Sequence, residues 1–169
     1  MNRKISKLFS LEGKVACITG ASNGLGQEVA STLVENGARV IGIARNKNLL
    51  ESWSQKTGPN AAYITSDLTE RNNIKKITTQ ISEFFGPPDI LINAAGVNTR
   101  EHADDVTFNN WNKTIELNLA APFFIAQALV PNMKRKGWGR IVNFASLQSR
   151  RAFPSGLSYG ASKGGVEQM

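Results

Sequence analysis

Short apolar runs alternate with longer amphipathic stretches along this chain, and that alternation restricts the folds it can adopt. Strands are predicted at residues 14–19, 39–44, 61–65, 89–93 and 140–144. Helices are predicted at residues 24–36, 47–56, 69–85 and 107–136, and another begins at residue 158. Continuous apolar strands alternating with helices indicate an α/β protein with a parallel sheet covered on both faces. Right-handed crossovers then predict a doubly wound sheet. No linker or repeat divides residues 1–169, so we expect one domain.

Four residues are expected to shape the helices. Gly37 suits the C-terminal cap of the first helix, and Thr69 suits the N-terminal cap of the third. Pro122 and Pro131 are expected to interrupt the long helical region, because proline removes a backbone hydrogen bond.

A glycine-rich turn joins the first predicted strand to the first helix. Glycines in such a turn permit a sharp bend, close approach of a pyrophosphate and tight packing of the helix on the sheet. The helix N-terminus adds free N–H groups and a positive dipole end. The spacing is Gly-x-x-x-Gly-x-Gly, and ordinary turns also use glycine, but the strand–turn–helix setting favours a dinucleotide site. The expected contacts are Gly20, Ser22, Asn23, Gly24, Leu25 and Gly26.

The end of the second predicted strand bears on the choice of cofactor. A carboxylate at this place usually binds the ribose hydroxyls of NAD. Here the sequence has Arg45 and no carboxylate. An arginine can pair with a 2′-phosphate through two hydrogen bonds. We therefore expect Arg45 to contact the cofactor and NADP to be preferred over NAD; the alternative is that Arg45 is a surface loop residue.

Tyr159 and Lys163 are spaced to share one face of the last predicted helix. A free phenol ionises near pH ~10 and is a poor base at neutral pH. The Lys163 ammonium, together with the positive ring of an oxidised nicotinamide, would favour the phenolate. The hydroxyl of Ser146, at the end of the fifth strand, is placed to hydrogen-bond a substrate oxygen. These residues indicate general acid–base catalysis beside a hydride acceptor.

Composition narrows the remaining possibilities. The formal charge is +7, with basic clusters at residues 133–140 and 150–151. Such clusters attract polyanions, but cations also suit a helix C-terminus, and we expect no nucleic-acid partner. No apolar run reaches the ~20 residues that cross a bilayer, so we expect a cytoplasmic protein with no membrane partner. Cys17 is expected to be a buried, inert thiol. With His102 as the single histidine, no metal site is expected.

The separated motifs together resemble the short-chain dehydrogenase/reductase family, in its gluconate-type and 3-oxoacyl-reductase-like branch. The resemblance covers residues 11–169 and implies a Rossmann-type, NAD(P)-binding domain. It implies that Asp67 binds the adenine amino group beside the Leu68 backbone, and that residues of the fourth-strand motif line the cofactor. Ala94 replaces the usual second asparagine of that motif. The further cofactor contacts that the resemblance implies are Asn93, Ala95, Gly96, Tyr159 and Lys163.

The resemblance also implies a catalytic set of Asn118, Ser146, Tyr159 and Lys163. Asn118 would hold a water in a proton relay with Lys163. From the residues alone, Asn118 is a polar residue inside a predicted helix. Its side chain competes with backbone hydrogen bonding there, which indicates a local kink or a special role.

Family members usually continue well beyond this length, so we expect a C-terminally truncated version of the family fold that lacks its last strands. The fifth strand would then be an exposed sheet edge that invites association. The last helix, with about three turns, would be marginal on its own. We therefore expect weak activity from the chain alone and self-association, while the family implies a homo-oligomer, either a dimer or a tetramer.

The leading functional hypothesis is an NAD(P)-dependent oxidoreductase that interconverts a secondary alcohol and a ketone. The alternative is a nucleotide-binding or partner-binding protein with little catalysis; a sugar-nucleotide epimerase or dehydratase fits less well, because its glycine spacing is commonly shorter. Polar and basic residues after the fourth and fifth strands favour a sugar acid or another hydroxylated anion as the substrate, although exposed loop residues would look the same. These residues are Asn98, Arg100, His102, Arg150 and Arg151.

Overall fold

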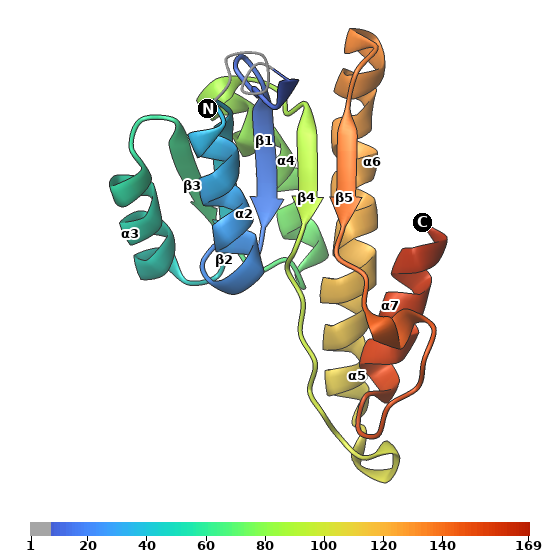
Figure 1. Cartoon of the computed structure of the whole chain (residues 1–169). Coiled ribbons are helices and arrows are strands. Elements are labelled where there is room, and N and C mark those ends of the chain that lie inside the picture. The colour runs from blue at the N-terminus through green and yellow to red at the C-terminus, as the bar shows by residue number, and fades with distance from the viewer. Residues whose placement is uncertain (1–7) are drawn as a thin grey trace.

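A five-stranded parallel sheet forms the centre of the computed structural model, which describes residues 8–169 (Figure 1). The strands lie in the order β3-β2-β1-β4-β5, and every neighbouring pair is parallel. This confirms the predicted doubly wound α/β fold. Their bounds are β1 (Val15–Thr19), β2 (Arg39–Ala44), β3 (Ala61–Thr65), β4 (Ile90–Asn93) and β5 (Arg140–Asn143).

Helices cover both faces of this sheet (Figure 1). One face packs on α2 (Gly24–Glu35) and α3 (Lys47–Thr57), and the other packs on α4 (Arg71–Phe85) and α6 (Ala121–Lys136). The helices α5 (Phe108–Ile115) and α7 (Leu157–Gln168) pack against each other below the end of the sheet. Short turns lie at η1 (Ala103–Asp105) and η3 (Leu147–Ser149).

The core is split into two apolar layers by the alternation of side chains along the strands. In β1, Ala16 and Ile18 face the α2–α3 layer, and Cys17 faces the α4–α6 layer. Each fully buried Ile or Leu side chain contributes about 1.5–3 kcal/mol relative to exposure. Burial raises the pKa of the Cys17 thiol to about 12, which confirms the expectation of a buried cysteine.

The predicted long helix is broken by a π segment, not by its prolines. The segment η2 (Glu116–Ala120) has π-helical geometry and separates α5 from α6. Pro122 follows the π segment closely, with helical backbone before it, and α6 continues through Pro131. The prediction of interruptions at the prolines was therefore wrong, and Asn118, for which a kink or a special role was predicted, lies inside the π segment.

By length and apolar composition, the stretch Phe108–Lys136 meets the requirements of a membrane-crossing helix. The core helix of a globular protein meets them as well. Here Ala121, Ile125, Leu129 and Met133 repeat on one side of α6 and pack into the core layer beneath the sheet. That packing supports a core helix.

The N-terminus of α4 also differs from prediction. The helix begins at Arg71 after Glu70, and no side chain caps it. The N–H and the hydroxyl of Thr69 instead donate to Asp67 Oδ1, at 2.9 and 2.8 Å. Thr69 is therefore not the predicted cap, because it lies one residue before Glu70, the N-cap residue of α4. Gly37 has the positive φ of 95° that its predicted place after a helix requires.

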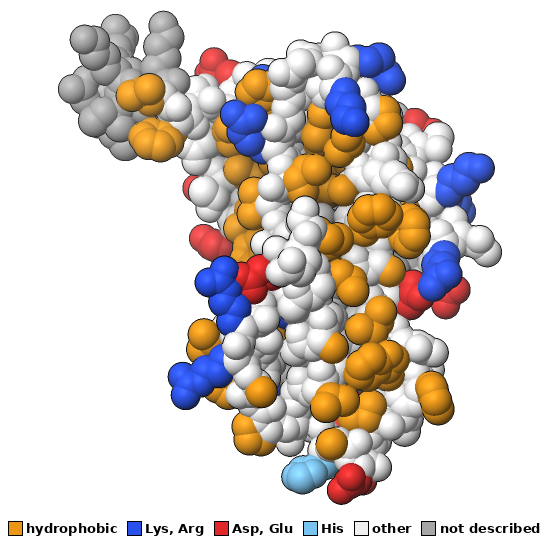
Figure 2. Space-filling model, turned by 90° about the vertical axis from the view of Figure 1, so that its right-hand side faces the viewer, with side chains coloured by type: hydrophobic (Ala, Val, Ile, Leu, Met, Phe, Trp, Pro, Cys, Tyr) orange, Lys and Arg blue, Asp and Glu red, His pale blue; other side chains and the backbone are white. Residues whose placement is uncertain are grey.

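Within the described residues β5 pairs on one side only, with β4. Ile141 and Val142 are 40% and 47% exposed, as expected for an uncovered strand. Figure 2 shows hydrophobic side chains spread over this side of the molecule, which is the right-hand side of Figure 1.

One carboxylate ties the amino ends of β1 and β4 to the carboxyl end of α6. Asp89 Oδ2 accepts from the Val15 N–H at 3.0 Å, and Oδ1 accepts from Lys136 Nζ at 2.8 Å. Burial alone would raise the pKa of Asp89, but the hydrogen bonds from Lys136 and Val15 and the nearby lysine charges outweigh it, so the pKa lies below its ordinary value. The carboxylate form of Asp89 therefore stabilises the folded state.

We expect Asp89→Ala to lower the free energy of unfolding by about 2 kcal/mol at pH 7, because it leaves the buried Val15 N–H without an acceptor. A carboxylate whose pKa is lowered by folding stabilises above its unfolded pKa of about 3.9, and this stabilisation is lost as pH falls through the folded value. The difference between wild type and variant in urea denaturation should therefore shrink below pH ~4. Asp105→Ala, at an exposed site in η1, is the control; an equal loss there would contradict the prediction.

Candidate nucleotide-binding and catalytic site

A cleft of about 520 Å³ opens at the carboxyl ends of the strands. The chain leaves β1 and β4 in opposite directions there, and ligands bind at such switch points in doubly wound sheets. The lining residues are 20, 22–26, 43–46, 66–68, 94–96 and 117. The cleft thus gathers every cofactor contact predicted from the sequence except Asn93, Tyr159 and Lys163.

The glycine turn fits close against the loop after β4. Gly20 has a φ of +75°, and a Cβ there would lie 2.8 Å from the Ala95 backbone nitrogen. A Cβ on Gly26 would collide with the Gly20 carbonyl oxygen. Gly24 has a φ of +53°, and the space beside it is open. The Ala95 N–H also donates to Thr19 Oγ1 at 3.1 Å, which fixes the two loops together.

The residues present fit a dinucleotide. The first turn of α2 lines the cleft, and the side chain of its N-cap residue, Asn23, makes no capping hydrogen bond. That turn carries no acidic residue. Uncapped N–H groups at a helix start, approached over glycine, form an anion site for a pyrophosphate.

A basic and an acidic residue face each other at the far end of this cleft. Arg45 Nη1 lies 3.9 Å from Asp67 Oδ2, and the two side chains are 60% and 39% exposed. Burial acts to raise the pKa of Asp67. The Thr69 hydrogen bonds and the charges of Arg45 and Lys113 outweigh this effect, so the pKa lies below its ordinary value. Asp67 is therefore an ionised acceptor at neutral pH, and the weak, exposed pair leaves Arg45 able to take another anionic partner.

Asn93 does not point its side chain into the cleft. Its Nδ2 donates to Asn143 Oδ1 at 2.9 Å, across the register pair that joins β4 to β5. Its Oδ1 is buried and has no hydrogen-bond partner in the described part of the chain. Ala94, Ala95 and Gly96, which follow Asn93, form the cleft wall instead.

Lys163 is buried at the boundary between the sheet and α7. Lys163 is 5% exposed, and the residues next to it in α7 are the small Ser162 and Gly164. Nζ donates to the Phe144 carbonyl oxygen and lies 5.7 Å from the centre of the Tyr159 ring. Burial lowers the pKa of the Lys163 ammonium. Nζ also lies 3.9 Å from the position of a Cβ on Gly96, so the lysine adjoins the wall of the nucleotide cleft.

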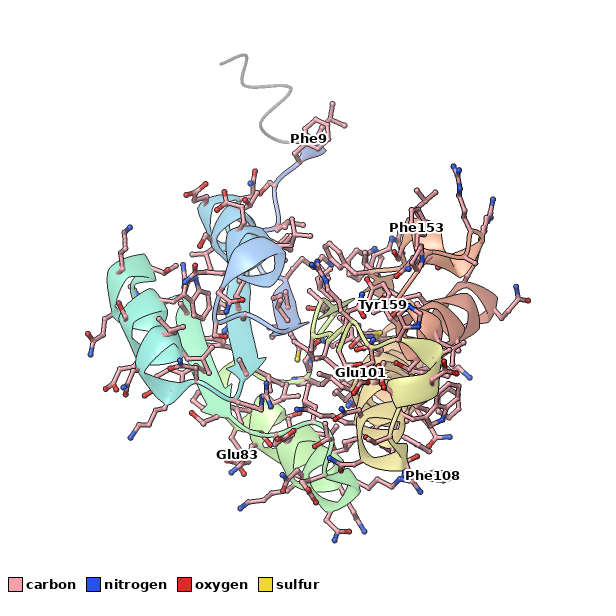
Figure 3. The ribbon with its side chains drawn as sticks, turned by 90° about the horizontal axis from the view of Figure 1, so that it is seen from below. Phe9, Glu83, Glu101, Phe108, Phe153 and Tyr159 are labelled. Atoms are coloured by element: carbon pink, nitrogen blue, oxygen red, sulfur yellow. The ribbon has the colours of Figure 1, made fainter. Side chains whose placement is uncertain are left out.

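Tyr159 lies on the side of the molecule formed by α5 and α7, between Phe153 and Glu101, when the structure is seen from the carboxyl ends of the strands (Figure 3). The helices α2 and α3 occupy the opposite side of that view. The ring is partly exposed. Tyr159 and the glycine turn at the start of α2 thus lie at the same end of the sheet, on opposite sides of the view in Figure 3.

Asn118 connects the loop after β4 to α7. Its Oδ1 accepts from the Val97 N–H at 2.8 Å, and its Nδ2 donates to the Val97 carbonyl at 2.9 Å and to Ser162 Oγ at 3.0 Å. Ser162 in turn donates to the Tyr159 carbonyl at 2.7 Å. The π segment directs this side chain inward, where it is 1% exposed. Sequence reasoning missed Val97 and Ser162; the signal for Ser162 was its position one helical turn after Tyr159.

Ser146 ends the segment that follows β5 and caps the short turn η3. Its Oγ accepts from the Gln148 N–H at 3.1 Å, which leaves the hydroxyl proton available for an outside acceptor. Among the described residues, no hydrogen bond joins the hydroxyls of Ser146 and Tyr159.

A second cleft of about 510 Å³ lies between the η1 region and the segment from η3 to α7. His102, Arg150 and Arg151 line it, whereas Asn98 and Arg100 do not. Arg150 forms an ion pair with Glu167. Arg151 lies 5.8 Å from the Phe153 ring and has no acidic partner among residues 8–169.

Known proteins share this architecture and sequence. The family model for short chain dehydrogenases matches residues 14–169. The NAD-dependent glycerol dehydrogenase of Listeria innocua is 35% identical, and 96% of this chain aligns with 64% of that protein. The gluconate 5-dehydrogenase of Gluconobacter oxydans is 36% identical, with the same two shares. The chain therefore spans just under two thirds of the length of these curated relatives.

A solved structure gives the same result in three dimensions. A metagenomic short-chain oxidoreductase in complex with NADP superposes with a TM-score of 0.89 at 32% identity. The match covers 94% of this chain and 73% of that protein. Sequence, sheet order and the glycine-lined cleft all agree, and the chain belongs to the short-chain dehydrogenase family.

Proposed function

We propose that this chain carries the nucleotide-binding and catalytic parts of an NAD(P)-dependent oxidoreductase that interconverts a secondary alcohol and a ketone. One observation carries the proposal: Lys163, one helical turn from Tyr159, is buried against Gly96 in the wall of the nucleotide cleft. A proton-transfer group and a hydride carrier must adjoin in this reaction, and burial of a lysine there needs a reason beyond packing.

Bound nicotinamide would supply or accept the hydride. We propose that the Tyr159 hydroxyl gives its proton to the carbonyl oxygen in reduction and takes it back in oxidation. The Lys163 ammonium lies 5.7 Å from the centre of the Tyr159 ring, on the same helix, and the hydroxyl proton of Ser146 donates to the substrate oxygen. The amide of Asn118 is fully engaged with Val97 and Ser162, so its side chain acts by orienting the cleft wall and α7.

Tyr159→Phe should lower kcat for ketone reduction by about 10²-fold or more, because it removes the proton donor. NADPH affinity, measured by fluorescence quenching, should stay within about twofold of wild type, since the glycine turn is untouched. The measurement is the loss of NADPH absorbance with a panel of keto-gluconates, 3-oxoacyl thioesters and hydroxysteroid ketones.

Tyr63→Phe is the matched control, since Tyr63 is the other of the two tyrosines and lies in β3. Full turnover by Tyr159→Phe would contradict the mechanism. NADPH binding without turnover of any ketone by the wild type would favour the alternative, a nucleotide-binding protein without catalysis.

For the cofactor, we propose a preference for NADP. Arg45 lines the cleft at the end of β2, is exposed, and has only a distant partner in Asp67. One relative is NAD-dependent and one solved neighbour holds NADP, so relatives use both forms.

Arg45→Ala should weaken NADPH binding about tenfold, the value of one charge-assisted pair, and leave NADH binding nearly unchanged. Titration calorimetry with both cofactors measures the two dissociation constants. Arg135→Ala, an exposed arginine at the end of α6, serves as the control. An equal loss for NADH and NADPH would rule out a contact with the 2′-phosphate.

For the substrate, we propose a hydroxylated anion such as a sugar acid. Its support is the second cleft, where Arg150 is engaged by Glu167 but Arg151 has no acidic partner among the described residues. One relative is named for gluconate. In the ketone panel, turnover of a steroid alone would end this proposal.

We also propose that the protein forms homo-oligomers. The one-sided pairing of β5 and the exposure of Ile141 and Val142 support it, because uncovered strand edges associate. Val142→Lys should shift the sedimentation velocity profile toward the monomer, whereas Thr79→Lys, on the exposed side of α4, should not. A monomeric wild type at micromolar concentration would contradict the proposal.

A further inference from the structure

Ser149 joins the two catalytic segments through a single hydroxyl group. Its Oγ accepts from the Ser146 N–H at 3.3 Å and donates to the Lys163 carbonyl at 2.8 Å. Its own N–H donates to the Ser146 carbonyl at 3.0 Å. Ser149 therefore closes the η3 turn on Ser146 and, with the same atom, holds that turn to α7.

Lys163 is consequently fixed at both ends by the segment that carries Ser146. Its Nζ donates to the Phe144 carbonyl, and its own carbonyl accepts from Ser149. Phe144 and Ser149 lie on either side of Ser146 in sequence. Motion of this segment would move Ser146 relative to both ends of Lys163, and through the helix relative to Tyr159.

The contact between η3 and α7 is close along its length. A Cβ on Gly160 would lie 3.5 Å from the Gln148 carbonyl oxygen, and one on Gly164 would lie 3.6 Å from that of Ser149. These glycines leave no bulk between the helix and the turn. A Cβ at either position would make only ordinary van der Waals contact, so the helix and the turn lie near each other without touching there, and the Ser149 hydroxyl bridges them.

We propose that Ser149 is a positioning residue that sets the placement of the Ser146 hydroxyl relative to Tyr159 and Lys163. The inference rests on the proposed alcohol–ketone reaction, in which both hydroxyls must reach one substrate oxygen. Small misplacements of such groups cost rate steeply, because the geometry of attack is lost. A serine that only caps η3 would affect folding stability alone.

The experiment compares Ser149→Ala, Ser149→Thr and the control Thr79→Ala in the full chain. Among residues 8–169, the Thr79 hydroxyl donates only to the Lys75 carbonyl oxygen in its own helix. Ser149→Ala should lower kcat about tenfold or more, with the KM for NADPH within about twofold of wild type. Ser149→Thr keeps the hydroxyl and should recover most of the rate. Thr79→Ala should match wild type.

Amide exchange gives a readout that needs no turnover. The Ser146 N–H should exchange at least about tenfold faster in Ser149→Ala, because its acceptor is gone. If the alanine variant does not fold, Ser149→Cys replaces it, since a thiol fills similar space but bonds weakly.

Three outcomes would overturn the inference: unchanged kcat in Ser149→Ala, an equal loss of rate in Thr79→Ala, or unchanged exchange at Ser146. A wild type without turnover would contradict the proposed reaction, and Ser149 could then have no role in catalysis. The exchange result would still decide whether the Ser149 hydroxyl holds the Ser146 N–H.

Discussion

The part of the structure that carries the proposed catalytic residues depends on how one buried ammonium group is hydrogen-bonded. Lys163 is almost fully buried, and a buried charge is costly unless it is hydrogen-bonded. The Phe144 carbonyl supplies that bond from the end of β5. The cost of leaving the charge unpaired therefore holds α7 against the carboxyl end of the sheet, where β5 stops and the loop to η3 begins. The positions of Tyr159 and Ser146 follow from the same contact.

The π segment has the corresponding role on the other side of the cleft. A regular helix over residues 108–136 would place Asn118 differently, because each π turn adds one residue. With the extra residue, the Asn118 amide reaches both the Val97 backbone and Ser162. The loop after β4, the long helix and α7 are thereby joined at one buried side chain. Without these hydrogen bonds, the three elements would be free to shift against one another.

Most of the fold could be predicted from the sequence because strand and helix periods differ and glycines mark the turns. All five strands were predicted to within one residue at each end. The errors occurred where a side chain had a choice of partners. Thr69 is not a cap because α4 begins only at Arg71, and Pro131 lies inside a helix that packing against the core holds in place. The site residues were predictable as motifs, but Ser149 and Ser162 were not, since their bonds run between segments that periodicity cannot bring together.

The packing of Gly20 against Ala95 has a consequence for how this protein can evolve. Where Gly20 and Ala95 line the nucleotide cleft, main chain packs against main chain with no room for a side chain between them. Mutation can hardly widen or reshape a wall that consists of peptide groups. New preferences would therefore arise at side chains that line the two clefts, such as Arg45 in the first and Arg151 in the second, while the glycine turn stays unchanged.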